Sequence, residues 1–273
     1  MKHAQYISFF LLLFSCEKPK FDIQNLNNEI VVLGHGGMGI SHPYPMNSFE
    51  SISKCLNTRA QGVEIDVQMT KDSILVAYHD SDLSSDTNKS GRISDLYWDE
   101  VKDAKYKEFP YLNYSILSLE QLFLNIENIH DHKFIFDCKW DVHSLSDSSA
   151  YINSFVAALS EMVERFEIHD KVYFESKNSD FLLKVQYNNP NYKLFIYSLS
   201  FEDGLNKAID LGLYGISIST QNITKEQISL AHSHYLFVSI WNVNSNQCNI
   251  TAINKNPDFI QSDRIFHLLD LLH

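Results

Sequence analysis

The sequence is poor in basic residues and contains no cluster of them. Its 273 residues include 34 Asp and Glu but only 22 Lys and Arg, which gives a formal net charge of −12. Proteins that bind nucleic acids hold the phosphate backbone with groups of Lys and Arg. We therefore expect no nucleic-acid partner.

Cysteine is also scarce. Cys16 lies in the N-terminal segment, and Cys55, Cys138 and Cys248 are far apart in the sequence. Without Cys16, three widely spaced cysteines remain, and this odd number argues against a disulfide framework and against a cysteine-based zinc site. One disulfide and buried free thiols remain as alternatives.

The apolar stretch at 7–14 is too short to span a bilayer. It follows a positively charged start and ends just before a small residue and Cys16, which is the arrangement of an export signal. The LFSC ending resembles a bacterial lipobox and predicts cleavage before Cys16 and a lipid on that cysteine; the alternative is a plain secretory signal. We expect a signal peptide over 1–15, a lipid-anchor tether over 16–29, and an exported lipoprotein facing the periplasm or the cell exterior.

Short runs rich in Val, Ile and Phe recur from residue 30 onward, separated mostly by longer stretches with helical periodicity. This is the pattern of βα units around a parallel sheet. The length from 30 to 273 suits a single TIM-barrel domain. Nine strands are expected, at 30–35, 63–67, 74–79, 133–139, 171–176, 193–198, 215–219, 236–243 and 259–263.

One of these nine strands does not belong to the barrel. Parallel neighbours need a crossover of about a dozen residues, yet only QMTKDS separates Val67 from Ile74. The two strands flanking this segment must therefore form an antiparallel hairpin. Without 74–79, eight strands remain, so we predict an α/β fold: a TIM (β/α)8 barrel with a small β-hairpin excursion after strand 2.

Two carboxylates lie in the first strand of this hairpin. Glu64 and Asp66 share a face because side chains alternate along a strand. A hairpin that turns about 70–73 places His79 opposite Glu64, and a slip of one residue would break this facing. Close like charges repel unless a cation neutralises them, so the acids predict a site for Ca²⁺ or Mg²⁺. The alternative is a solvated strand end with surface acids.

Two other strand ends carry matching groups. Asp137 and Lys139 share one face of the strand at 133–139, while the apolar residues occupy the other, so the acid and the base are expected to point into the barrel. His35 follows the first strand, at the end where TIM-barrel active sites form. A lone His or Lys is more often structural, but several strand ends with the same chemistry predict an active site.

The order and spacing of short motifs resemble the glycerophosphodiester phosphodiesterase family from about residue 31 to the C-terminus. Members of this family typically show H-R-G, P-E-N-T, E-x-D followed by T-K-D and H-D, then E-x-K, W-T-V-N and T-D. The corresponding segments here are HGG at 35–37, PMNS at 45–48, EID at 64–66, TKD at 70–72, HD at 79–80, DCK at 137–139, WNVN at 241–244 and SD at 262–263.

The resemblance implies a TIM barrel, one divalent cation (Ca²⁺ or Mg²⁺), and hydrolysis of glycerophosphodiesters or a related phospholipid headgroup. Asp137 stands where the family usually has glutamate, one methylene longer, so its coordination is expected to be looser or water-mediated. Carried over residue by residue, the resemblance assigns a general acid/base pair (His35 and His79), metal ligands (Glu64, Asp66 and Asp137), a phosphate-neutralising lysine (Lys139) and an aromatic wall beside the substrate (Trp241).

Two positions depart from the family pattern. Gly36 replaces an arginine and Met46 replaces a glutamate. The glycine predicts either weaker binding of the phosphate or extra space beside it that a bulkier headgroup would fill. We therefore expect poor turnover of glycerophosphocholine and glycerophosphoethanolamine and a preference for larger headgroups. Two other functions remain open: a lipid-anchored binding protein that kept the pocket but lost turnover, and a lyase like the phospholipase D toxins. The two histidines favour an enzyme, whereas Gly36 and Met46 favour the binding protein.

Overall fold

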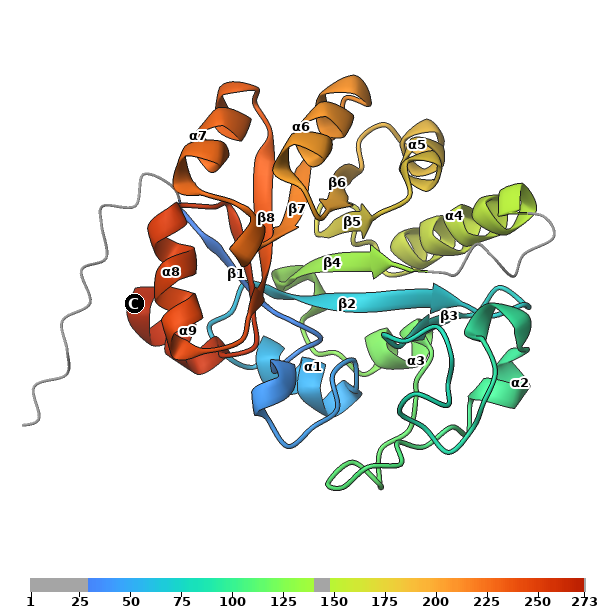
Figure 1. Cartoon of the computed structure of the whole chain (residues 1–273). Coiled ribbons are helices and arrows are strands. Elements are labelled where there is room, and N and C mark those ends of the chain that lie inside the picture. Colours follow the sequence, from blue (N-terminus) through green and yellow to red (C-terminus); the bar gives the residue numbers. More distant parts are fainter. Residues whose placement is uncertain (1–28, 140–147, 273) are drawn as a thin grey trace, which may run out of the picture.

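The computed structural model describes residues 29–139 and 148–272 (Figure 1). In these residues, eight parallel strands close into a barrel because β1 pairs with both β2 and β9. The predicted TIM barrel is therefore confirmed. Its strands are β1 (Val31–Gly34), β2 (Gly62–Met69), β4 (Lys133–Cys138), β5 (Val172–Ser176), β6 (Lys193–Ser198), β7 (Gly215–Ser219), β8 (Phe237–Val243) and β9 (Phe259–Ser262).

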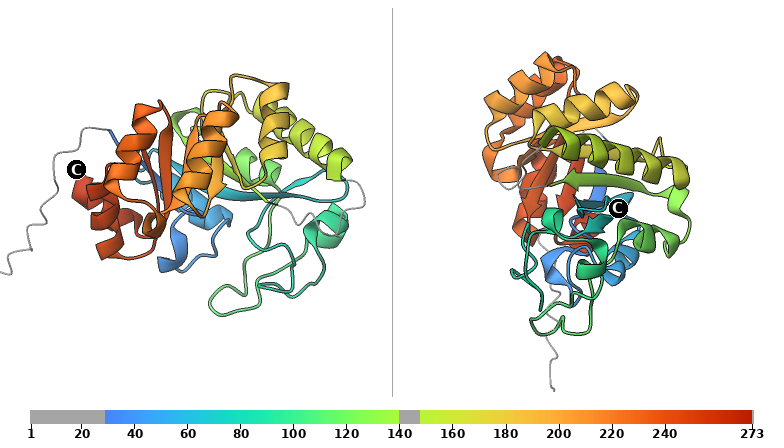
Figure 2. Two further views of the ribbon diagram at one scale, coloured as in Figure 1. Left: turned by 45° about the horizontal axis from the view of Figure 1, so that its top comes forward. Right: turned by 90° about the vertical axis from the view of Figure 1, so that its right-hand side faces the viewer.

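Helices cover the outside of the barrel, as Figure 2 shows from two directions. Several of them begin at a polar side chain that accepts a hydrogen bond from a backbone amide of the first turn, as Ser48 and Ser118 do. The helices are α1 (Phe49–Leu56), α3 (Leu119–Leu124), α4 (Ser148–Arg165), α5 (Ser179–Asn188), α6 (Phe201–Asp210), α7 (Lys225–Ser233), α8 (Asn246–Lys255) and α9 (Ile265–Leu272).

The barrel strands are rich in apolar residues because both faces of a barrel strand are buried. Phe134 and Phe136 of β4 belong to the large core between the strands and the helices. Ile135, between them, points the other way and packs inside the barrel with Leu33 and Phe195. The small inner core occupies part of the barrel interior, while other inward positions carry polar side chains.

The predicted hairpin is present, but its predicted register is wrong. Strand β3 (Leu75–Ala77) runs antiparallel to β2, with Leu75 opposite Met69 and Ala77 opposite Val67. This pairing is shifted by one residue from the prediction, so Glu64 does not face His79. The cause is the turn, which includes one more residue than predicted because Ser73 adopts a left-handed conformation (φ 66°).

The excursion continues well beyond β3. Residues 78–117, which we call the insertion, include the short helix α2 (Trp98–Val101) and lie beside β2 and β3 (Figure 1). The insertion has its own apolar core, so it packs as a distinct part of the domain. This core consists of Tyr78, Leu83, Ile93, Val101, Ala104, Tyr106 and Ile116, together with Val76 of β3.

The predicted signal peptide and most of the predicted tether lie outside the described residues. Within the described ranges, the structure contains no helix with both the length and the apolar character needed to cross a bilayer. The three described cysteines are free thiols, with Cys55 and Cys138 buried and Cys248 partly exposed. Of the two alternatives for these cysteines, the structure therefore contains the free thiols.

Candidate active site

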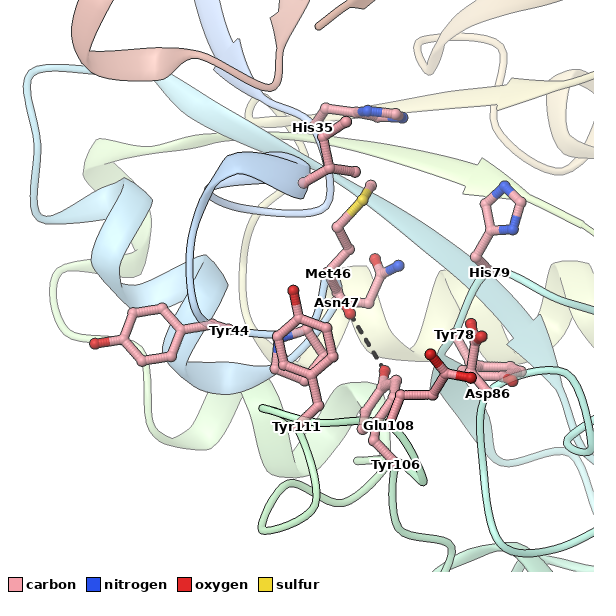
Figure 3. Close-up of a pocket in the computed structure, with 12 residues that line it drawn as sticks. His35, Tyr44, Met46, Asn47, Tyr78, His79, Asp86, Tyr106, Glu108 and Tyr111 are labelled. Atoms are coloured by element: carbon pink, nitrogen blue, oxygen red, sulfur yellow. Dashed lines mark hydrogen bonds between the residues drawn. The ribbon is translucent and has the colours of Figure 1, made fainter.

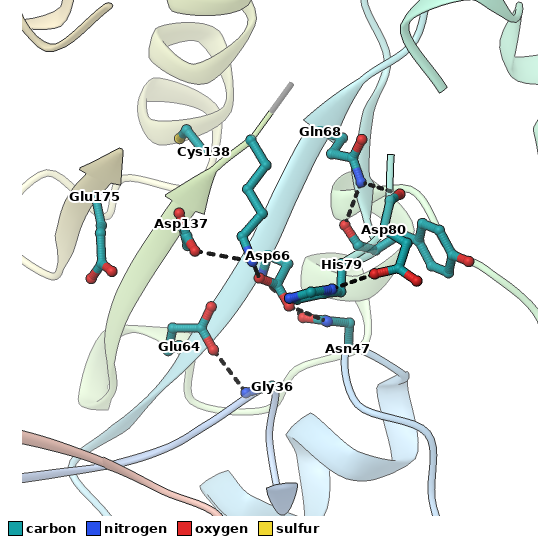
Figure 4. A network of polar contacts seen from close by, with 12 residues as sticks. Gly36, Asn47, Glu64, Asp66, Gln68, His79, Asp80, Asp137, Cys138 and Glu175 are labelled. Carbon is teal, nitrogen blue, oxygen red and sulfur yellow. Dashed lines mark hydrogen bonds and ion pairs between the residues drawn. The ribbon is translucent and has the colours of Figure 1, made fainter. Parts of the chain in front are cut away.

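Three carboxylates converge from the middle of β2 and the carboxyl end of β4 (Figure 4). Asp66 and Asp137 are direct neighbours across the two parallel strands, and Glu64 lies two residues before Asp66 on the same face. One oxygen of each carboxylate lies within 4.8 Å of the others. All three side chains are buried.

The connection between β1 and α1 holds two of these carboxylates in place. The backbone amide of Gly36 donates a hydrogen bond to Oε2 of Glu64 at 2.9 Å. The Asn47 side chain donates to Oδ2 of Asp66 at 2.7 Å and accepts from the Asp66 backbone amide at 3.0 Å. Asn47 belongs to the PMNS segment at 45–48, but no sequence pattern predicts this pair of contacts with Asp66.

Lys139 supplies positive charge to the cluster. Its ammonium group forms ion pairs with Asp66 and, at 3.1 Å, with Oδ2 of Asp137. Burial alone would raise the pKa of Asp66, but the charges of Lys139 and His79 outweigh it and lower that pKa to about 2. The prediction that Asp137 and Lys139 point into the barrel is confirmed.

The carboxylates fit a hard divalent cation. Oxygens that bind one Ca²⁺ at about 2.3–2.6 Å lie at most about 5 Å apart, and the 4.8 Å limit among Glu64, Asp66 and Asp137 is within this range. Burial and the Asp66 charge raise the pKa of Glu64 well above its usual value. Burial also raises the pKa of Asp137, although Lys139 opposes this effect. A divalent cation would relieve the repulsion that causes part of these shifts.

His35 follows β1 and is oriented by a residue from the other end of the chain. Its Nδ1 lies 2.9 Å from Oδ1 of Asp263, which follows β9. Burial lowers the pKa of His35, but the hydrogen bond to Asp263 and the charge of Glu64 outweigh this effect and raise it to about 9. Asp263 belongs to the SD segment at 262–263, but no sequence pattern predicts its contact with His35.

His79 reaches the same site by a route that the sequence did not predict. It follows β3, and its position results from the turn after that strand, since the hairpin register does not place it opposite Glu64. Its Nδ1 lies 2.6 Å from Oδ1 of Asp80, and its side chain is 58% exposed. Figure 4 shows His79 beside Asp66.

A cavity of about 360 Å³ joins the two histidines (Figure 3). His35 and His79 line it from the barrel side, together with Asn47, which also contacts the carboxylate cluster. The opposite wall comes from the insertion. The cavity therefore places two imidazole groups and the amide bound to Asp66 around one space.

The comparison with protein families agrees with this geometry. Residues 35–267 match the model of the glycerophosphoryl diester phosphodiesterase family. The chain belongs to this family. It is 25% identical over 229 residues to a glycerophosphodiester phosphodiesterase of Bacillus altitudinis, covering 82% of this chain and 91% of that protein.

Two further similarities support the family assignment and the fold. The chain is 24% identical over 247 residues to a glycerophosphodiester phosphodiesterase of Caldanaerobacter subterraneus, covering 89% of this chain and 97% of that protein. A phosphodiesterase of Oleispira antarctica, solved with the product sn-glycerol-3-phosphate, superposes with a TM-score of 0.77 at 20% identity, covering 90% and 97% of the two chains. This second likeness concerns the fold.

The two departures from the family pattern touch each other. A Cβ added to Gly36 would lie 2.8 Å from both Cβ and Cε of Met46, and the glycine has a φ of +54°. Met46 therefore occupies the space beside Gly36. The expectation of free volume at this position is wrong, because the arginine and the glutamate of the family pattern are replaced together by a glycine–methionine contact.

Trp241 lies near the carboxyl end of β8. Its ring stacks on Tyr197 with centroids 5.1 Å apart and an interplanar angle of 14°. The described residues that line the cavity do not include Trp241. Its role as an aromatic wall beside the substrate stays a prediction.

Glu175 is a buried acid that the sequence reading missed. It lies on β5 beside Asp137 and accepts a hydrogen bond at 3.1 Å from Nε2 of Gln261, a residue of β9. Burial and the charge of Asp137 raise the pKa of Glu175 to about 8. In the sequence, the only indication of its role is an acidic residue at an inward position of a mostly apolar strand. No family motif includes it.

Proposed function

We propose that this protein hydrolyses glycerophosphodiesters with the help of one divalent cation, Ca²⁺ or Mg²⁺. The observation that carries this proposal is the convergence of three buried carboxylates beside a cavity lined by two histidines. Membership of the glycerophosphoryl diester phosphodiesterase family supports it. Glu64, Asp66 and Asp137 would hold the cation, which supplies positive charge for the phosphate oxygens.

His35 and His79 are the proposed proton-transfer pair. In each, Nδ1 contacts a carboxylate, of Asp263 or Asp80, which favours the tautomer with a proton on Nδ1 and leaves Nε2 for exchange. One histidine accepts a proton from the attacking hydroxyl, either of water or of the substrate. The other donates a proton to the departing alkoxide.

Lys139 is proposed to neutralise the substrate phosphate. Its ammonium group already lies at the carboxylates, where Asp66 and Asp137 raise its pKa despite its burial. It therefore stays protonated beside the position at which a phosphate would meet the cation. Trp241 is proposed to provide an aromatic surface near the same end of the barrel.

The experiment combines cation binding with turnover. Thermal melting of the wild type should shift upward with millimolar Ca²⁺ or Mg²⁺ and return with EDTA, because a ligand that binds only the folded state stabilises it. Asp66→Asn should lose this shift. An unshifted wild type, or an equal shift in Asp66→Asn, would rule out the cation site.

Turnover is tested with a panel of glycerophosphodiesters. His35→Ala and His79→Ala should each lower kcat by about 10²- to 10⁴-fold while keeping the cation-induced melting shift. A variant with near-wild-type kcat would show that its histidine is structural. Phosphorus NMR of the products separates hydrolysis, which gives a phosphomonoester, from the lyase alternative, which gives a cyclic phosphodiester.

The binding-protein alternative has one observation in its favour, the contact between Gly36 and Met46 where the family pattern has charged residues. Calorimetric binding of glycerophosphodiesters without any product formation would support it. Product formation at a rate that falls in both histidine variants would exclude it.

We also propose that the protein is an exported lipoprotein with a lipid on Cys16. The support is the short apolar segment that ends in LFSC and the polar stretch that follows it. Such a tether would keep the barrel at a membrane surface facing the periplasm or the cell exterior.

A further inference from the structure

The amino ends of β7 and β8 carry a group of aromatic side chains. Tyr214, just before β7, stacks on Phe237, the first residue of β8, with ring centroids 4.3 Å apart and an interplanar angle of 5°. Phe237 is 39% exposed, and Tyr235, two residues before it, is 93% exposed. These three residues, which we call the aromatic patch, lie at the end of the barrel opposite to the cavity with the two histidines.

Tyr235 has a backbone conformation that tyrosine rarely adopts. It follows α7 with a φ of +61°. Its amide donates to the His232 carbonyl at 2.9 Å, and the amide of Leu236 donates to the Ala231 carbonyl at 3.1 Å. Glycine is usual in this helix-ending turn, as Gly212 is after α6 with a φ of +60°. Since the exposed ring adds little packing, the strained tyrosine indicates a contact outside the domain.

The N-terminal segment joins the barrel at this same end. The described chain begins at Glu29 and enters β1 at Val31. Val31 pairs with Phe259 of β9, which in turn pairs with Ser239 of β8. Val31 therefore lies two strand spacings, about 10 Å, from Ser239, and Phe237 is two residues before Ser239.

The distance to the proposed lipid is short. Glu29 follows Cys16 by 13 positions in the sequence, so their Cα atoms lie at most about 45 Å apart. The longest barrel strand, β2, has 8 residues and by itself spans about 26 Å. To turn the catalytic end toward the bilayer, the tether would have to run back along the whole barrel. The anchor therefore favours contact through the amino end.

The catalytic end also exposes an aromatic ring. Phe109 of the insertion is 88% exposed, but Glu108 precedes it and lines the cavity. Anionic lipid headgroups repel such an acidic surface. The amino end carries charges of both signs, with Asp170 and Lys171 just before β5 and Lys193 at the start of β6. An anionic bilayer therefore repels the amino end less.

We propose that the aromatic patch lies on the bilayer to which the lipid on Cys16 anchors the protein, so that the cavity opens toward the aqueous phase. Tyrosine suits a membrane interface because its ring is apolar while its hydroxyl is polar. The inference rests on the lipid anchor proposed above and adds the orientation of the barrel.

The test places one additional tryptophan at either end of the barrel. The full-length protein is purified from membranes and anchored in phosphatidylcholine vesicles whose acyl chains are brominated near the headgroup, because bromine quenches tryptophan on contact. Tyr235→Trp reports on the aromatic patch, and Phe109→Trp is the matched control, since each replaces one exposed aromatic ring with another. After subtraction of the wild-type emission, we expect quenching in Tyr235→Trp and none in Phe109→Trp.

The outcomes separate the orientation from the anchor and from turnover. Quenching of Phe109→Trp instead, or of neither variant, would overturn the orientation. Co-flotation with the vesicles is measured first: wild-type protein that does not float lacks the anchor, and the inference fails with it. A dimer in detergent that Tyr235→Ser dissociates would assign the patch to a second copy of the chain and also overturn the membrane contact. Turnover is tested separately by the panel of diesters.

Discussion

Asp263 orients His35 through a contact that is absent from the linear motif. Its Oδ1 lies 2.9 Å from Nδ1 of the imidazole, and the hydrogen bond and charge raise the pKa of His35. Asn at this position keeps the shape but removes the charge. We expect Asp263→Asn to lower kcat by about 10²- to 10⁴-fold and to move the His35 limb of the pH profile of kcat/KM to lower pH.

A matched control exists at another His–Asp pair of the same protein. His232 Nε2 lies 2.8 Å from Oδ2 of Asp258, outside the cavity and the carboxylate cluster. Asp258→Asn should leave the pH profile of turnover unchanged. A profile unaltered in Asp263→Asn would show that this carboxylate only supports the fold.

Glu175 should make the cation-free protein less stable as the pH rises. Its pKa is raised to about 8 in the folded protein and is near 4.3 in an unfolded chain. Between these values the folded state binds more protons than the unfolded state, so the free energy of unfolding falls with increasing pH. Glu175→Gln removes the titrating group and should flatten this part of the profile.

The measurement is the melting temperature in EDTA between pH 5 and pH 8. Glu127→Gln, at an exposed position, is the control and should follow the wild type. A Glu175→Gln profile parallel to that of the wild type would contradict the assigned titration. His35, whose raised pKa acts in the same direction above its usual value, is present in all three proteins and cancels in the comparison.

The elements differ in how far the sequence determined them. The barrel was predictable because the apolar runs and the distances between them leave few topologies. The loop between β2 and β3 was short enough to require a hairpin, but the register depended on the left-handed conformation of Ser73. A single backbone dihedral angle moved every pairing by one residue, and hydrophobic periodicity carries no information about it.

The site was predictable where its residues lie on strands and less so where they lie on loops. The alternation of β2 and β4 placed Glu64, Asp66 and Asp137 on inward faces. His79 reached the cavity although the pairing used to place it was wrong. Asn47 and Asp263 act through tertiary contacts that no local pattern contains.

The loop from Gly36 to Asn47 should not accept an arginine at its first residue. The Gly36 φ of +54° is unfavourable for other residues, and the side chain would collide with Met46. Residues with a left-handed backbone cost about 1–3 kcal/mol, and the collision adds to this. We expect Gly36→Arg to lower the urea midpoint, and Met46→Ala in the same protein to restore part of it.

Gly212→Arg separates the two contributions to this loss. Gly212 has a similar φ of +60° but no heavy atom within 4 Å of an added Cβ. It therefore reports the backbone strain alone. Equal destabilisation by the two arginine substitutions would mean that the contact with Met46 contributes nothing.

At the scale of the whole molecule, the proposed lipid on Cys16 determines where the barrel works. Cys16→Ser should move the protein from the membrane fraction to the soluble fraction, because no lipid can then be attached. Fractionation followed by immunodetection measures this, with Cys248→Ser as the control because Cys248 lies in α8. Membrane association that persists in Cys16→Ser would refute the anchor.

The pairing of β1 with β9 has a consequence for the order of events during biosynthesis. His35 and Asp263 are separated by 228 residues in the chain, so the contact that orients the imidazole cannot form until the chain has been synthesised as far as Asp263. Contacts between such distant residues also form slowly during folding. The His35 imidazole of a nascent chain therefore lacks its carboxylate partner until β9 closes the barrel.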